Sequence, residues 1–225
     1  MSPAEIVARA KSSGLGGFAL SDHQSARNTP AVAECARRAG IECLCGLEVC
    51  TAEEVHVLAL FDTPEQALEM TDWVYAALPK RVNDPDVFGD QPVVSADDEI
   101  IEMEWRILAM ACRRTIAETS AECRRLGGLC IAAHIDRSSF SVFSQLGDIP
   151  DGGFFDAVEL SRTADETVWL PKTRGLAAVR SSDAHNLDDI AKVWAEADAA
   201  GFSVAALKDV FARRAVSVSP RLTRF

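Results

Sequence analysis

The alternation of short apolar windows with longer amphipathic windows constrains the fold of this chain more than any other feature. Residues 17–21 (GFALS), 42–49 and 55–61 (VHVLALF) are short and apolar, which predicts buried strands. Residues 30–38 and 63–78 have helical periodicity. Strands that alternate with helices favour a mainly parallel α/β sheet, and in such folds the chemistry lies at the carboxyl ends of the strands.

The rest of the chain continues this pattern, with one exception. A capping box at Ser2 and Glu5, with proline between them, predicts a helix that runs to about Ser13. The further predicted strands are 129–133, 155–160, 176–180 and 215–218, and the further predicted helices are 115–126, 204–214 and one that begins within 186–191. The exception is about 79–105, which is polar and rich in Asp and Pro. We expect it to be an insertion or a long active-site loop in a single domain that covers 1–225.

Composition and net charge limit the cellular location and the classes of partner that we expect for this protein. No apolar run approaches the roughly 20 residues that span a bilayer, and the N-terminus does not resemble a signal peptide, so we expect a cytoplasmic protein without membrane contact. The net charge of -11 repels polyanions, so extended nucleic acid is not an expected partner. A small phosphorylated substrate remains compatible with this charge, because bound divalent cations can supply positive charge locally.

All four histidines of the chain lie near acidic residues, at or close to the ends of predicted strands. The histidines are His23, His56, His134 and His185, and the acids are Asp22, Glu48, Glu159 and Asp183. Imidazole and carboxylate are the ligands expected for Zn, Mn or Fe. Side chains at several strand ends meet at one edge of a barrel, so the pattern predicts a site for more than one divalent metal ion. The direction of His56, which lies within a strand, depends on its register.

Four short motifs resemble those of the PHP (polymerase and histidinol phosphatase) superfamily, and together they cover nearly the whole chain. They are Ala19-Leu20-Ser21-Asp22-His23, Gly46-Leu47-Glu48 followed by Val55-His56-Val57-Leu58, Ala133-His134, and Ser182-Asp183-Ala184-His185. The resemblance implies a distorted (β/α)7 barrel. Members of the family open with a strand that ends in Asp-x-His-x-His, and no such sequence occurs in this chain. We therefore expect a barrel without its first strand and a depleted first metal site.

The resemblance also implies roles for individual residues. Glu48 resembles the carboxylate that bridges two metal ions, and Asp183 resembles both a ligand of the first metal and a base for the attacking water. These two are the expected catalytic residues. His56 and His134 resemble ligands of the second metal, and His23 and His185 resemble ligands of a third. Asp22 is expected to orient a ligand, and the candidates for substrate contact are Arg137, Glu159, Arg162 and Arg180.

The activity that this resemblance implies is metal-dependent hydrolysis of a phosphoester. The expected substrate is a small phosphomonoester or a nucleotide, which a metal-bound hydroxide would attack at phosphorus. Two alternatives remain open at this stage. One is a non-catalytic PHP-like protein that binds a metal or a ligand, because the first metal site is depleted. The other is a C–N hydrolase, because related barrels use similar metals.

Overall fold

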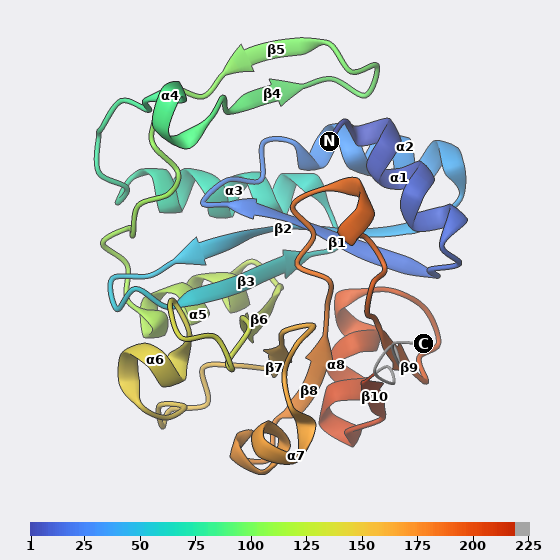
Figure 1. Ribbon diagram of the computed structural model, residues 1–225, viewed down its shortest axis with the longest axis vertical. Helices are drawn as coiled ribbons and strands as arrows, with labels where there is room; N and C mark the ends of the chain where they lie inside the picture. The colour runs from blue at the N-terminus through green and yellow to red at the C-terminus, as the bar shows by residue number, and fades with distance from the viewer. Residues whose placement is uncertain (219–225) are drawn as a thin grey trace.

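The structure, a computed structural model, describes residues 1–218 and is built around one curled sheet (Figure 1). The sheet has six strands in the order β1-β2-β3-β6-β7-β8. Their bounds are Gly17–His23 (β1), Glu42–Cys50 (β2), His56–Phe61 (β3), Leu129–Ala132 (β6), Ala157–Leu160 (β7) and Ala177–Arg180 (β8). Each of these strands falls within two residues of a strand predicted from the sequence.

One strand, β3, runs against its neighbours. β1 is parallel to β2, and β6, β7 and β8 are parallel to one another, but β3 is antiparallel to both β2 and β6. The segment 51–55 that joins β2 to β3 is too short for a parallel crossover, which needs a dozen or more residues. The expectation of a mainly parallel sheet therefore fails at β3. As a result, the beginning of β3 lies at the same edge of the sheet as the carboxyl ends of the other strands.

The sheet is a half-barrel in the part of the chain that the structure describes. β1 and β8 are its two edge strands, and they run in the same direction. Residues of both strands line one cavity of about 1340 Å³. This is a mixed α/β fold of the expected type, although six strands in the main sheet do not confirm the expected count of seven.

Helices cover the sheet, and most begin at a side-chain cap. The main helices are Pro3–Ser12 (α1), Thr29–Ala39 (α2), Pro64–Tyr75 (α3), Ile116–Arg125 (α5) and Val204–Arg213 (α8), and the short ones are Val142–Leu146 (α6) and Glu166–Trp169 (α7). Capping boxes start α1, α3 and α5, each satisfying backbone N–H groups that the first turn leaves unpaired. The helix expected within 186–191 is only a short 3-10 turn, Leu187–Asp189.

The core has one cluster on each face of the sheet, because side chains alternate along each strand. Leu47 and Val57 point to the face covered by α3, where they belong to the same buried cluster as Met70. Leu44 and Leu60 point to the opposite face and share a cluster with residues of α8. A two-stranded sheet of Ala195–Ala197 (β9) and Val216–Val218 (β10) lies beside α8. No helix within residues 1–218 is long and apolar enough to cross a membrane.

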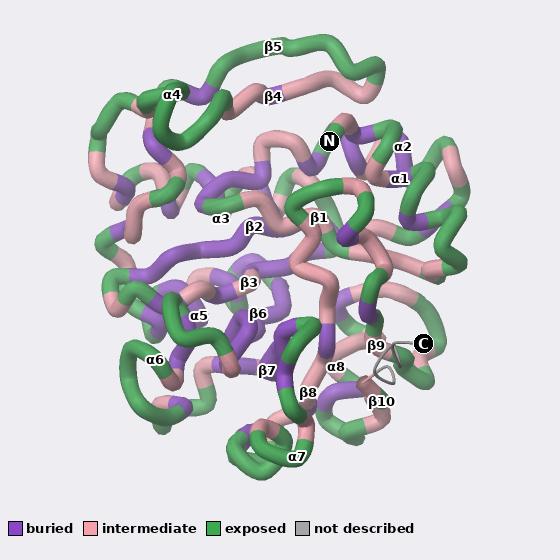
Figure 2. The backbone as a smooth tube through the Cα atoms, in the orientation of Figure 1, coloured by how far each residue is buried: buried purple, intermediate pink, exposed green. Residues whose placement is uncertain are grey.

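The segment expected as an insertion folds into a short helix and a hairpin. The helix is Pro85–Phe88 (α4), and the antiparallel strands are Pro92–Val94 (β4) and Ile100–Met103 (β5). The hairpin stands apart from the main sheet at the top of Figure 1. In Figure 2, β5 is exposed along its length, whereas β4 is partly buried.

Candidate metal centre

The centre of the site is the Glu48 carboxylate, which contacts three histidines. Glu48 Oε2 lies 2.9 Å from His23 Nδ1. Glu48 Oε1 lies 3.2 Å from His56 Nδ1 and 3.3 Å from His134 Nε2. The three histidines come from the end of β1, the beginning of β3 and the residues after β6. The reversal of β3 therefore brings His56 to the same edge of the sheet as the other two.

The donor atoms are close enough together to hold a cation. One donor atom from each of His23, Glu48 and His56 lies within 4.8 Å of the other two. The fourth residue, His134, brings its Nε2 within 3.3 Å of His56 Nδ1. His134 Nδ1 is buried and has no hydrogen-bond partner among the described residues. Imidazole nitrogens and carboxylate oxygens this close together form a ligand set that suits Zn, Mn or Fe, so the residues present fit such an ion.

The electrostatics of the cluster favour an ionised carboxylate. Burial alone would raise the pKa of Glu48, but contacts with His134, His23 and His56 lower it well below its usual range. Hydrogen bonding to Glu48 raises the pKa of His23. Burial lowers the pKa of His134, but the Glu48 carboxylate outweighs this and raises it overall. Positive charge is therefore stabilised around Glu48, which is the electrostatic condition that a metal cation needs.

A second carboxylate, Glu159, contacts the backbone of the proposed ligand His134. Glu159 is buried, and its Oε2 accepts a hydrogen bond of 2.9 Å from the backbone N–H of His134. Its Oε1 accepts a hydrogen bond from the hydroxyl of Ser181, which directly follows β8. His134 has a φ of 29°, in the left-handed region that non-glycine residues rarely adopt. Glu159 thus ties together the ends of β6, β7 and β8 and holds His134 in an unusual backbone conformation.

The segment after β8 brings Asp183 and His185 to the same cavity. Asp183 forms an ion pair with Arg137 through Oδ2, and its Oδ1 lies 3.7 Å from His185 Nδ1. The His185 ring is 6.2 Å from the His23 ring, measured between centroids. Asp183 also has a positive φ, 46°. Two residues with rare backbone conformations at one site are a pattern typical of functional sites.

The remaining predicted site residues are bonded in different places. Asp22 accepts a hydrogen bond of 3.2 Å from Asn28 Nδ2, and burial raises the pKa of Asp22. Arg162 pairs with Asp189 at 2.6 Å. Arg180 is buried and pairs with Glu166 at 2.9 Å. The structure thus brings Arg137 to Asp183, whereas the guanidinium groups of Arg162 and Arg180 pair with carboxylates outside the histidine cluster.

Three residues near the centre are not among the site residues predicted from the sequence. Phe140 stacks on the His56 ring at 4.7 Å, and its carbonyl accepts a hydrogen bond of 2.8 Å from the His56 backbone N–H. The Ser181 hydroxyl donates a hydrogen bond to Glu159. Its position directly before Ser182-Asp183 indicates from the sequence that it lies near the site. Asn28 contacts Asp22, and nothing in the sequence around it indicated this contact.

Solved structures share this fold at low sequence identity. A candidate metal-dependent phosphoesterase from Bifidobacterium adolescentis matches with a TM-score of 0.57 and 17% identity, over 94% of this chain and 91% of that one. The lesion-specific endonuclease EndoQ from Pyrococcus furiosus matches with a TM-score of 0.61 and 16% identity, over 97% of this chain and 53% of that one. This chain therefore spans about half the length of the endonuclease.

A third structure corrects the expectation about nucleic acid. It is Endonuclease Q in complex with a 27-mer duplex substrate that has an abasic lesion at the active site. It matches with a TM-score of 0.65 and 17% identity, over 95% of this chain and 52% of that one. We expected from the net charge that extended nucleic acid would not be a partner. That inference is wrong, because net charge does not exclude such a partner for this fold.

The sequence itself identifies the family. No curated protein sequence matches the chain. The sequence pattern of the PHP domain matches residues 1–148, about two thirds of the 225 residues. This matched region contains Glu48, His23, His56 and His134, the four residues that converge in the structure. The chain belongs to the PHP domain family.

Proposed function

We propose that this protein is a metal-dependent phosphoesterase that hydrolyses a phosphomonoester or a nucleotide. The observation that carries the proposal is the convergence of His23, His56 and His134 on Glu48, with distances of 2.9 to 3.3 Å to its carboxylate oxygens. Membership of the PHP domain family supports a metal-dependent hydrolase. The fold that it shares with a candidate metal-dependent phosphoesterase agrees with this reading.

The chain's own residues can divide the work of such a reaction. Glu48 and the three histidines would hold a divalent cation, which supplies charge neutralisation at the phosphate and lowers the pKa of water. Asp183 is the proposed base, because Arg137 occupies its Oδ2 and leaves Oδ1 to accept a proton. Arg137 is half-exposed beside Asp183, and we propose that it contacts the phosphate. Glu159 keeps His134 oriented toward Glu48.

The metal content implied by the family is a finer part of the same proposal. We propose that Glu48 and Asp183 serve a further cation, and that His185 acts with His23. Asp183 and His185 line the same cavity as His23 and Glu48, which supports this assignment.

A nucleic-acid strand is the second candidate substrate. The observation that favours it is the TM-score of 0.65 with Endonuclease Q in complex with its duplex substrate. Phosphodiester and phosphomonoester hydrolysis both need charge neutralisation at the phosphate, which a divalent metal centre supplies. The two candidates differ in what the cavity must accommodate beyond the phosphate.

The test is an activity panel on the purified chain with added Mn or Zn. The substrates are AMP, bis(p-nitrophenyl) phosphate, a DNA duplex with an abasic site, and an amide series. We expect turnover of at least one phosphoester, lost in Glu48→Ala and His134→Ala and kept in the surface control Glu69→Gln. Hydrolysis of amides alone would favour the C–N hydrolase. Absence of all turnover would favour a binding protein.

A further inference from the structure

The loop that follows His23 holds the β4–β5 hairpin in place. Asn28 lies in this loop, and its side-chain amide both donates a hydrogen bond to β4 and accepts one from it. Its Nδ2 donates to the Pro92 carbonyl at 3.2 Å, and its Oδ1 accepts from the Val94 N–H at 3.0 Å. The same Nδ2 also donates to Asp22, the residue before His23. Asn28 thus joins the metal-centre strand β1 to the hairpin through three hydrogen bonds, one to Asp22 and two to β4.

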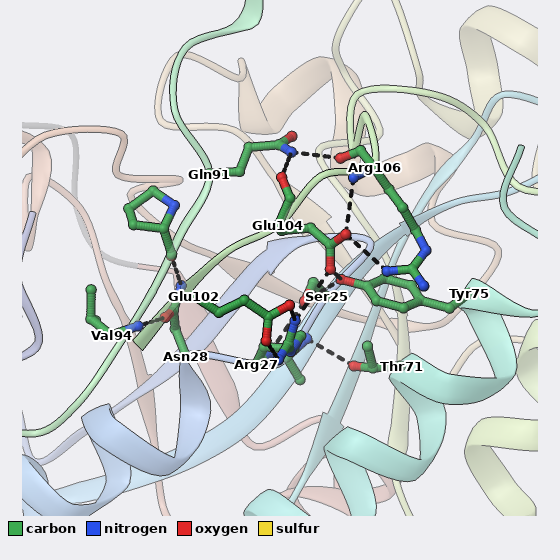
Figure 3. A network of polar contacts seen from close by, with 12 residues as sticks. Ser25, Arg27, Asn28, Thr71, Tyr75, Gln91, Val94, Glu102, Glu104 and Arg106 are labelled. Atoms are coloured by element: carbon green, nitrogen blue, oxygen red, sulfur yellow. Dashed lines mark hydrogen bonds and ion pairs between the residues drawn. The ribbon is translucent and has the colours of Figure 1, made fainter. Parts of the chain in front are cut away.

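The neighbouring residue, Arg27, holds the other strand of the hairpin (Figure 3). Its guanidinium donates two hydrogen bonds to Glu102, at 2.8 and 2.6 Å, and lies 3.4 Å from Glu104. Glu104 is buried and also accepts hydrogen bonds from the Tyr75 hydroxyl and from Arg106. A bidentate arginine and a buried carboxylate with several donors fix position more firmly than single surface contacts do. The hairpin is therefore a fixed wall.

This side of the molecule lines the cavity that also reaches His23 and Glu48 of the metal centre. Phe88, Pro92, Val94 and Leu108 line the same cavity as His23, Glu48 and Asp183. Pro92 and Val94 belong to β4, whereas Phe88 ends the preceding helix α4 and Leu108 follows the hairpin. Phe88 is 51% exposed, and polar residues of the same segment, Asp90, Gln91 and Glu104, also line the cavity. An exposed aromatic ring next to this anchored hairpin, in the same cavity as a phosphate-type site, is a surface on which a flat apolar group can stack.

We propose that the hairpin wall is the subsite for a flat, nucleobase-like group of the substrate, and that Phe88 is its stacking residue. The inference rests on the proposed phosphoesterase function, which it deepens by giving the chemical class of the group beyond the phosphate. The occupant follows from continuity, because one cavity is lined both by His23 and Glu48 of the metal centre and by Phe88 and β4. A substrate that presents its phosphate to His23 and Glu48 can extend from there along the cavity to Phe88.

The experiment compares two probes that have the same reacting group. AMP and ribose 5-phosphate are both primary alkyl phosphomonoesters, and only AMP has a base. We would measure kcat/KM for each with the Mn-loaded wild type, Phe88→Ala and Val87→Ala. Val87 is the matched control, because it belongs to the same helix α4 and is 67% exposed but does not line the cavity.

We expect the wild type to prefer AMP. The ratio of the two kcat/KM values should fall about tenfold in Phe88→Ala, the usual scale for loss of one base-stacking contact, and should not change in Val87→Ala. Equal use of both probes by the wild type, or an unchanged ratio in Phe88→Ala, would overturn the subsite.

A failure of the proposed function gives a different result. If the Mn-loaded wild type hydrolyses neither probe, calorimetric binding of AMP and of ribose 5-phosphate still tests the wall. Tighter binding of AMP that is lost in Phe88→Ala and kept in Val87→Ala would support the subsite without the activity. Equal binding of the two probes would reject it.

Discussion

The backbone N–H of His134 donates a hydrogen bond of 2.9 Å to Glu159 Oε2, across the ends of two neighbouring strands. This contact holds the backbone of His134 at a φ of 29° while its Nε2 faces Glu48. Positive φ values cost non-glycine residues about 1–3 kcal/mol and persist where surrounding contacts enforce them. The orientation of one proposed metal ligand therefore depends on a carboxylate that does not itself reach Glu48.

Replacing Glu159 should weaken metal binding without removing a ligand. In Glu159→Ala the His134 N–H and the Ser181 hydroxyl lose their acceptor, so His134 is no longer held toward Glu48. We expect metal affinity to fall about 10- to 100-fold, the usual effect of losing such a supporting contact. Competition with a chelator measures it. Glu159→Gln, which keeps an acceptor, should restore most of the affinity, and equal affinity in Glu159→Ala and the wild type would argue against this role.

Gly46 lets β2 and β3 approach each other beside the metal centre. A Cβ added at Gly46 would lie 2.5 Å from the Ala59 carbonyl oxygen and 2.5 Å from Leu60 Cδ2, so the two strands would have to move apart. We expect Gly46→Ala to lower the free energy of unfolding by about 1–3 kcal/mol, as overpacking does elsewhere. Urea denaturation checks this. The control is Gly16→Ala, whose added Cβ meets no atom within 4 Å and which should unfold like the wild type.

Asn28 should control the order of the hairpin. Asn28→Ala removes both hydrogen bonds to β4 and leaves the Val94 N–H without this acceptor, at a cost of about 1–3 kcal/mol. Hydrogen exchange followed by mass spectrometry should show faster exchange in 92–103 and unchanged exchange in β2. Equal exchange of the hairpin in both proteins would mean that Arg27 alone holds it.

Acid should loosen the anchor of the hairpin through Glu104. Burial raises the pKa of Glu104, but hydrogen bonds from Arg106 and Tyr75 outweigh burial and lower it. A carboxyl group with a lowered folded-state pKa contributes stability above its unfolded pKa of about 4.3, and loses it as pH falls through the folded value. The free energy of unfolding should therefore decrease as the pH is lowered below about 4.3. Glu104→Gln should be less stable at pH 7 and show a flatter acid dependence, and an unchanged acid slope would contradict this assignment.

Much of the sheet could be predicted because its strands are short, apolar and bounded by turn residues. Because side chains alternate along β2, Glu48 and Leu47 point to opposite faces of the sheet, and Leu47 is buried in the core. Three of the four histidines follow predicted strands, so their meeting at one edge followed from the layout of the fold. The position of His56 did not, because it depends on the reversed direction of β3, which is a property of the short 51–55 connection.

The features that the sequence did not indicate depend on contacts between distant segments. The polar segment 79–105 forms a hairpin because Arg27 and Asn28 bind it, and no local periodicity reflects that. Arg180 ends the apolar strand β8, where a phosphate ligand was expected, yet it pairs with Glu166 of α7, the helix that precedes β8 in the chain. In both cases the local sequence is compatible with several partners, and the tertiary structure selects one.

The metal content of the purified protein tests the central claim most directly. After dialysis against Mn, Zn or Fe and then against metal-free buffer, mass spectrometry should find bound divalent metal in the wild type and in Glu69→Gln. Glu48→Ala and His134→Ala should retain much less, because each loses a residue of the cluster in which Glu48 contacts all three histidines. Metal content that is unchanged in both variants, or absent from the wild type, would contradict the assignment of this cluster as a metal centre.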